Sequence, residues 1–329
     1  MIPVFGEVFG EPIPAYFTML MVGFVVAVAL GVRWARRHGY DHDVIIDLGL
    51  VSLVAGVAGA RLASVLFDGH LGDYVALCTD PSQVAWTMSQ ARCGPSGGVW
   101  DAAEGVCHPA QADCWAWARF WEGGLVWYGG VLGAAGFGVW LLRWERFPVA
   151  KALDLCGMIV PLGLFFGRLG CFFAGCCFGI HTDHWTALSF PPASPASEAQ
   201  YREGLLSTEL APSLPVLPTQ LFEAAGALAI AAVMMLLVEP RKRFDGQVFV
   251  LSMGAYAVLR FLLELVRADE RGALGWFTTS QWIGLLGLVV LAWLWRLFAR
   301  RARARMATPL AERRGVEGAA AEATVPGSR

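Results

Sequence analysis

The sequence is short of charge. Only 16% of its 329 residues are Asp, Glu, Lys or Arg, whereas 56% are hydrophobic. A soluble domain usually has about a quarter of its residues charged. The formal net charge of −2 gives no positive surplus for holding a nucleic acid, so we expect no nucleic-acid partner. No Lys or Arg precedes Arg33, so we expect no cleaved signal peptide, which would begin with a basic region.

Long apolar runs take the place of the missing charge. A helix needs about 20 apolar residues to cross a bilayer, and seven stretches of the chain fit this length. They are 16–32, 45–66, 123–142, 152–173, 217–238, 246–265 and 278–297. Within lipid each segment must satisfy its own backbone, which favours helices. The sequence therefore predicts an all-α, polytopic membrane helix bundle with about seven transmembrane helices.

The basic residues are distributed unevenly among the loops. They gather after the first, third, fifth and seventh spans, and cytoplasmic loops attract Lys and Arg. The main ones are Arg33, Arg36, Arg37, Arg143, Arg146, Lys151, Arg241, Lys242, Arg243, Arg296, Arg300, Arg301, Arg303 and Arg305. This pattern predicts an N-terminus outside and a C-terminus in the cytoplasm. Residues 1–305 then form a membrane domain with outer loops at about 67–122 and 174–216, and 306–329 form a disordered cytoplasmic tail.

The eight cysteines fall mainly into two groups. The first group lies in the first outer loop, where an oxidising compartment favours two disulfides, and three pairings are open. Its members are Cys78, Cys93, Cys107 and Cys114. The second group, Cys171, Cys176 and Cys177, follows the fourth span. Small packing residues, a disulfide, and a redox or metal role all stay open for this second group.

Three arginines lie near the outer ends of apolar spans: Arg61, Arg168 and Arg260. An arginine at the bilayer centre costs at least ~2.5–3.5 kcal/mol, which makes each one a functional hypothesis. Their similar depth suggests one anionic ligand, and a guanidinium matches a phospholipid phosphate in geometry. The alternative is snorkelling to headgroups or pairing with a carboxylate, as Arg260 and Glu264 are spaced to do.

The end of the fourth span carries a recognisable pattern. Residues 167–179 read GRLGCFFAGCCFG. This segment is similar to the signature G-R-x-G-N-F-x-N-x-E-x-x-G of prolipoprotein diacylglyceryl transferases. It departs from that signature at Cys171 and Ala174, which replace two asparagines, and at Cys176, which replaces a glutamate.

Further segments resemble the same family in the same order. They are 15–17, 59–62, 123–130, 154–161, 182–183, 218–223, 256–267 and 278–281. Tyr128 stands where the family has a histidine. The resemblance covers the chain from about residue 12 to residue 297.

The resemblance implies a multi-pass transferase of the bacterial inner (plasma) membrane. It would move a diacylglyceryl group from phosphatidylglycerol, a membrane lipid, to the lipobox cysteine of a prolipoprotein. Arg168 and Arg260 carry over as catalytic, phosphate-contacting residues. The supporting residues that carry over are Tyr16, Tyr256, Glu264 and Arg267, and we add Arg61 as a substrate-binding residue.

The proton acceptor is the least determined part of this reaction. We take Tyr128 as catalytic, with His181 and His184 as alternatives. Alkyl transfer needs no metal or redox cofactor, so we expect none. The departures at Tyr128, Cys171, Ala174 and Cys176 also favour an alternative, a non-catalytic or repurposed paralogue that binds anionic lipid or a lipoprotein.

Overall fold

The computed structural model describes residues 4–8, 11–69, 71–86, 90–120, 124–208, 210–267, 273–274 and 276–307. These residues form two compact units. The first unit holds the described residues of Met1–Tyr40 and Ala150–Arg329, and the second holds those of Asp41–Val149. Each unit is described by itself.

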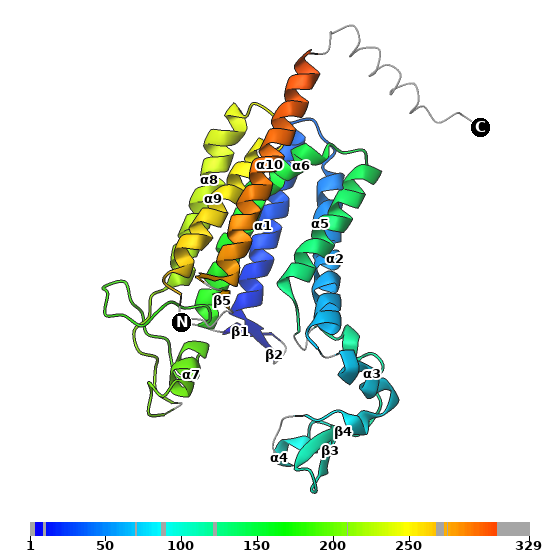
Figure 1. Cartoon of the computed structure of the whole chain (residues 1–329), viewed down its shortest axis with the longest axis vertical. Helices are drawn as coiled ribbons and strands as arrows, with labels where there is room; N and C mark the ends of the chain where they lie inside the picture. The colour runs from blue at the N-terminus through cyan, green and yellow to red at the C-terminus, as the bar shows by residue number, and fades with distance from the viewer. Residues whose placement is uncertain are drawn as a thin grey trace, which may run out of the picture. The chain divides into compact units, whose positions relative to one another are not determined.

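The first unit is built from long helices (Figure 1). They are α1 (Ala15–Arg37), α6 (Val149–Ala174), α8 (Thr219–Val233), α9 (Gln247–Glu264) and α10 (Thr279–Ala307). Helix α8 continues through a π-helical turn, η4 (Met234–Val238), and a 3₁₀ turn, η5 (Glu239–Arg241). Helix α9 packs against both α8 and α10.

Short elements complete this unit. Helix α7 (Pro195–Arg202) lies in the second predicted outer loop. Two small antiparallel pairs are β1 (Val4–Val8) with β2 (Glu11–Pro14), and β5 (Ala273–Leu274) with β6 (Phe277–Thr278). These hairpins leave the all-α class unchanged.

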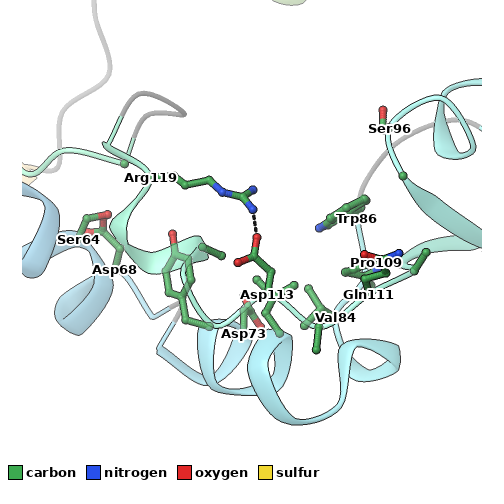
Figure 2. A pocket seen from close by; sticks show the side chains of 18 of the residues that line it. Ser64, Asp68, Asp73, Val84, Trp86, Ser96, Pro109, Gln111, Asp113 and Arg119 are labelled. Carbon is green, nitrogen blue, oxygen red and sulfur yellow. Dashed lines mark hydrogen bonds and ion pairs between the residues drawn. The ribbon is translucent and has the colours of Figure 1, made fainter.

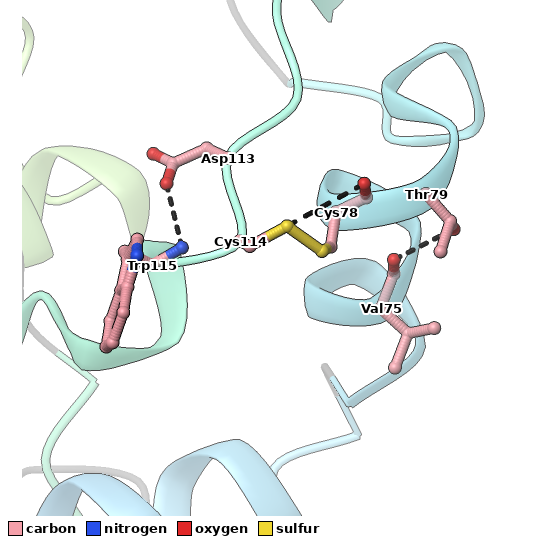
Figure 3. Close-up of a disulfide and its surroundings, with 6 residues drawn as sticks. All are labelled: Val75, Cys78, Thr79, Asp113, Cys114 and Trp115. Carbon is pink, nitrogen blue, oxygen red and sulfur yellow. Dashed lines mark hydrogen bonds between the residues drawn. A yellow bond between two sulfur atoms is a disulfide. The ribbon is translucent and has the colours of Figure 1, made fainter.

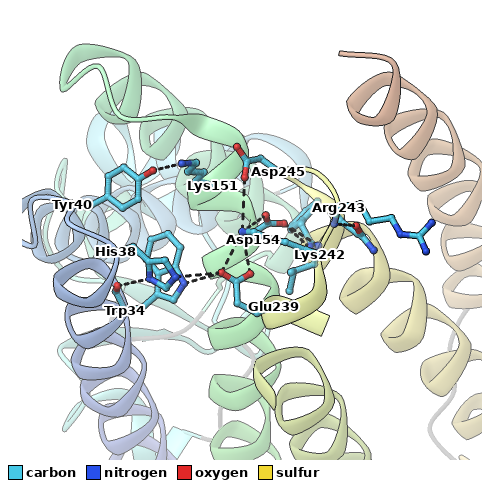
Figure 4. Close-up of polar contacts among 12 residues, drawn as sticks. Trp34, His38, Tyr40, Lys151, Asp154, Glu239, Lys242, Arg243 and Asp245 are labelled. Atoms are coloured by element: carbon cyan, nitrogen blue, oxygen red, sulfur yellow. Dashed lines mark hydrogen bonds and ion pairs between the residues drawn. The ribbon is translucent and has the colours of Figure 1, made fainter. Parts of the chain in front are cut away.

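Figure 4 shows a polar network that joins α1, α6 and the segment between α8 and α9. Asp154 of α6 is fully buried, and its Oδ1 accepts hydrogen bonds from the backbone N–H of Val248 at 2.9 Å and of Phe249 at 3.3 Å. Its Oδ2 accepts a hydrogen bond of 2.9 Å from Lys242 Nζ. A side chain of one helix therefore supplies acceptors that the first turn of another helix lacks. Lys242 also donates to Glu239 Oε1 at 3.2 Å.

The second unit is a helix pair with a folded outer loop. The pair consists of α2 (Asp43–Phe67) and α5 (Trp127–Trp144). The loop between them contains α3 (Leu71–Thr79), η1 (Pro81–Gln83), α4 (Gln90–Cys93), β3 (Gly98–Asp101), β4 (Val106–Pro109) and η2 (Ala116–Ala118). Strands β3 and β4 pair in antiparallel register.

Glycines let α2 and α5 approach closely, as in many membrane helix pairs. A Cβ built on Gly59 would lie 2.5 Å from the carbonyl oxygen of Gly129. A Cβ built on Gly133 would run into the carbonyl oxygen of Ala55. The contact between the two helices therefore depends on the absence of side chains at these positions.

Replacing Gly133 with valine is expected to destabilise the protein by about 1–3 kcal/mol, because the added atoms overpack the contact with α2. Thermal unfolding in detergent measures the change. Gly136→Val on the same helix is the matched control, since a Cβ there meets no described atom within 4 Å. Equal melting temperatures for the two variants would contradict the role of the close approach.

Two disulfides fix the loop between α2 and α5 in the second unit. The structure joins Cys78 to Cys114 (Figure 3) and Cys93 to Cys107, which is the nested pairing among the three that the sequence left open. This unit also contains a cavity of about 960 Å³. Asp113 and Arg119, which line it, form an ion pair (Figure 2).

Six described helices are long and apolar enough to cross a membrane. These are α1, α2, α6, α8 with its extension to Arg241, α9, and α10 within Ser280–Ala304. They correspond to six of the seven predicted spans, and the polytopic all-α class is confirmed. The remaining predicted span, 123–142, corresponds to α5, which has 18 residues, as α9 does, but is not among these six. Because α10 extends to Ala307, the first residues of the predicted tail are helical, and 308–329 lie outside the described residues.

Candidate active site

A buried carboxylate joins three segments of the first unit. Glu223 of α8 is fully buried, and its Oε1 lies 3.0 Å from Arg168 Nη2 of α6. The same oxygen accepts a hydrogen bond of 2.8 Å from the Tyr256 hydroxyl of α9. The other oxygen, Oε2, lies 3.8 Å from Nη1 of Arg267, which is only 3% exposed. Arg168, Tyr256 and Arg267, which were predicted from the sequence, are thus brought together around Glu223.

A second acidic side chain holds Arg260. Arg260 Nη2 lies 2.6 Å from Glu264 Oε2, one helical turn further along α9. Glu264 Oε1 accepts a hydrogen bond of 2.9 Å from the Thr278 hydroxyl, just before α10. Tyr256, which donates to Glu223, lies one helical turn before Arg260 on α9, so the two arginine–glutamate pairs belong to one cluster.

The cluster has unused donors. It contains three guanidinium groups and two carboxylates. Among the described residues, the buried Nε of Arg168 and both Nη atoms of Arg260 have no hydrogen-bond partner; the Arg260–Glu264 contact is an ion pair by distance alone. Buried donors without acceptors are costly. An anion that enters the cluster would supply acceptors for these donors.

Tyr16 lies at the same end of the unit. A Cβ built on Gly170 would lie 3.1 Å from Tyr16 Cδ2, so the tyrosine of α1 packs directly on α6. Gly170 follows Arg168 by two residues on α6. Tyr16, assigned from the family-like segment 15–17, therefore packs on the helix end that carries Arg168.

The glycine-rich signature ends α6 with a particular hydrogen-bonding pattern. Gly175 has a φ of 74°, its N–H donates to Phe172 O at 3.2 Å, and Cys176 N–H donates to Cys171 O at 3.2 Å. This is a Schellman end, which needs a residue with positive φ and favours glycine there. It folds the chain back, so that residues five apart in the sequence become neighbours.

The first turn of α8 holds the chain that leaves this helix end. The Thr219 hydroxyl donates to Cys177 O at 2.8 Å, and Gln220 Nε2 donates to Cys176 O at 2.7 Å. Hydrogen bonds with the thiols of Cys171 and Cys176, together with the charge of Arg168, lower the pKa of the Cys177 thiol.

Two other predicted site residues belong to the second unit. Arg61 is buried, and its Nε and Nη2 donate to the carbonyl oxygens of Trp117 at 2.7 Å and Ala116 at 3.0 Å. These bonds give Arg61 a structural role in the outer loop, and its contact with a headgroup stays a prediction. Tyr128, in the first turn of α5, is 51% exposed, and its role as proton acceptor also stays a prediction.

No role was predicted for Glu223, although it ends the family-like segment 218–223. The signal that could have revealed it is an acidic residue within an apolar span, which is costly unless it is paired. Its partners come from α6 and α9, so only the packing of the helices shows which cations it serves.

The fold and this cluster define a multi-pass membrane protein that gathers arginines and glutamates at one end of its helices. The profile of the prolipoprotein diacylglyceryl transferases matches residues 3–297, and the chain belongs to this family. It is therefore a transferase.

Several curated relatives carry the same activity in their names. Phosphatidylglycerol–prolipoprotein diacylglyceryl transferase 2 of Clostridium perfringens is 25% identical over 288 residues, which cover 87% of this chain and 91% of the relative. The phosphatidylglycerol–prolipoprotein diacylglyceryl transferase of Clostridium tetani is 26% identical over 292 residues, with 88% and 95% covered. The Xylella fastidiosa protein of that name is 32% identical over 204 residues, with 55% and 65% covered.

Proposed function

We propose that this chain transfers the diacylglyceryl group of phosphatidylglycerol to the lipobox cysteine of a prolipoprotein. The names of its relatives support the substrates. The observation that carries the proposal is the pair of buried arginines Arg168 and Arg260, whose guanidinium groups keep donors without hydrogen-bond partners among the described residues. A phosphodiester headgroup is an anion of matching chemistry.

The reaction exchanges one bond at a glyceryl carbon for another. The substrate thiolate attacks that carbon, a C–S bond forms, and the C–O bond to the phosphate breaks. The electron pair leaves with glycerol phosphate, and the thiol proton passes to an acceptor, for which Tyr128 is our candidate. Negative charge grows on the leaving phosphate, where preorganised cationic donors lower the barrier most. Arg168 and Arg260 supply those donors, while Glu223 and Glu264 hold their guanidinium groups in place.

The proposed orientation puts this cluster where both substrates are found. With the N-terminus outside, α1 and α8 begin at the outer face, while α6 and α9 end there. Tyr16, Arg168, Glu223, Arg260 and Glu264 all lie at these ends. The cluster would thus face outer-leaflet headgroups and proteins arriving by export.

The direct test is product formation by the purified chain. It is incubated with vesicles containing phosphatidylglycerol and a peptide that carries a lipobox cysteine. Mass spectrometry is expected to find the thioether-linked diacylglyceryl peptide, together with released glycerol phosphate. A peptide with serine in place of the cysteine, and vesicles of phosphatidylcholine alone, are the controls. Lipid binding without any product would contradict the proposal and favour the non-catalytic paralogue.

A further inference from the structure

Three thiols outside any disulfide meet where α6 ends. Cys171 is buried, Cys176 and Cys177 are half-buried, and their Sγ atoms all lie within 4.8 Å of one another. Thiolates bind Zn²⁺ at about 2.3 Å, which puts sulfurs around one ion roughly 4 Å apart. Small side-chain rotations would therefore bring all three sulfurs to a single ion.

The backbone that carries these thiols is held in shape from two sides. The Schellman end of α6 places Cys176 next to Cys171, while Thr219 and Gln220 of α8 bind the carbonyls of Cys177 and Cys176. Cys177 adopts a φ of 62°, a left-handed conformation that costs energy for a residue with a side chain. The surrounding hydrogen bonds maintain this conformation, so the cluster is preorganised.

The charge of the three sulfurs bears on the kind of ion that fits. Three thiolates would leave a net negative charge after binding Zn²⁺ or Cu⁺. Soft thiolate ligands select these ions over Mg²⁺ or Ca²⁺.

An unused acceptor lies beside the cluster. Gln220 is 1% exposed, and its Nε2 binds Cys176 O at 2.7 Å. Its Oε1 has no hydrogen-bond partner within the described part of the chain. Zn²⁺ with three protein ligands keeps a fourth position for water, and such a water needs an acceptor of this kind.

We propose that Cys171, Cys176 and Cys177 form a binding site for one thiophilic d¹⁰ cation, Zn²⁺ or Cu⁺. The three sulfurs would bind as thiolates, and their protons would be released to solvent. A disulfide would use only two of the three sulfurs. The site goes beyond the proposed transfer reaction and does not depend on it. It also revises the expectation from the sequence that no metal would be bound.

The test is metal stoichiometry in the purified full-length protein. The chain is stripped of metal under reducing conditions and divided into two arms, one loaded with Zn²⁺ and one with Cu⁺. Elemental mass spectrometry is expected to find one ion per chain in at least one arm. Cys176→Ser is expected to weaken binding by more than ~10-fold, because even the loss of an outer-shell partner costs 10–100-fold. Cys156→Ser is the matched control and should still bind one ion, since Cys156 lies outside the cluster on the same helix.

A spectroscopic measurement covers the case in which the serine variant fails to fold. Co²⁺ added to the wild-type protein is expected to give the intense near-ultraviolet absorption of cobalt–thiolate bonds, and added Zn²⁺ should remove it. Thiols that stay reduced without binding any ion in either arm would overturn the proposal. Isolation of the protein with a disulfide between two of the three cysteines would overturn it as well.

Discussion

Replacing Arg168 with alanine is expected to slow diacylglyceryl transfer by about 10²–10³-fold, which corresponds to ~3–4 kcal/mol of lost transition-state stabilisation. The reason is the position of its guanidinium group, which combines an ion pair to buried Glu223 with an unused Nε donor. Arg260→Ala is expected to have an effect of similar size. The rate is measured as thioether product formed at saturating phosphatidylglycerol, so that weaker lipid binding is separated from slower chemistry.

Two further variants make this prediction decisive. Arg168→Lys keeps a positive charge beside Glu223 but loses the planar fork, so it should fold and still be slow. Arg37→Ala, at the exposed far end of α1, should retain wild-type turnover. Melting temperatures of all variants show whether a loss of rate reflects unfolding. Near-normal rates for both Arg168→Ala and Arg260→Ala would contradict the proposed mechanism.

Asp154→Ala is expected to destabilise the protein by about 3 kcal/mol, near the lower end for breaking a buried ion pair. The change removes the acceptor of Lys242 and of two backbone N–H groups at the start of α9. Lys242 keeps Glu239 as a partner at 3.1 Å, which limits the loss. Thermal unfolding in detergent measures the effect.

The control for this variant is Asp245→Ala. Asp245 lies 3.9 Å from the same lysine and is 32% exposed, so its loss should cost less than about 1 kcal/mol. Equal losses in the two variants would show that buried capping by Asp154 is unimportant.

The difference in stability loss between Asp154→Ala and Asp245→Ala should be insensitive to pH across the neutral range, because of the pKa of Lys242. Burial disfavours its charged form, but hydrogen bonds and charges from Asp154 and Glu239 outweigh burial and raise the pKa of Lys242. A raised pKa adds stability that is fully present below the ordinary lysine value of about 10.4 and is lost only at higher pH.

The helices were predictable because their signal is local. Apolar runs of about 20 residues mark the starts of α1, α2, α6, α8, α9 and α10 to within three residues, whereas α1 and α10 continue past the predicted ends into basic segments. The division into two units was not predictable, because it depends on which helices contact one another. The folded outer loop was also hidden, since its short helices and hairpin rely on two disulfides rather than on hydrophobic periodicity.

The site was predictable only in part. The family-like segments pointed to Arg168, Tyr256 and Arg260, whereas Glu223 acquires its importance through the packing of α8 beside two other segments. Arg61 shows another limit. Its depth in a span suggested a lipid ligand, which stays a prediction, and the sequence did not show that the loop that follows folds back and offers it backbone carbonyls. A sequence does not show which acceptors a returning loop will provide.

The hydrogen bonds from Thr219 and Gln220 to the end of α6 have a practical consequence for dividing the chain. A fragment that stops in the 174–216 loop would leave two backbone carbonyls without their donors. Split-protein reporters should therefore express both halves together, so that α8 can dock on α6. The exposed turn at Gly204, where an added side chain meets no described atom within 4 Å, is the place to interrupt the chain.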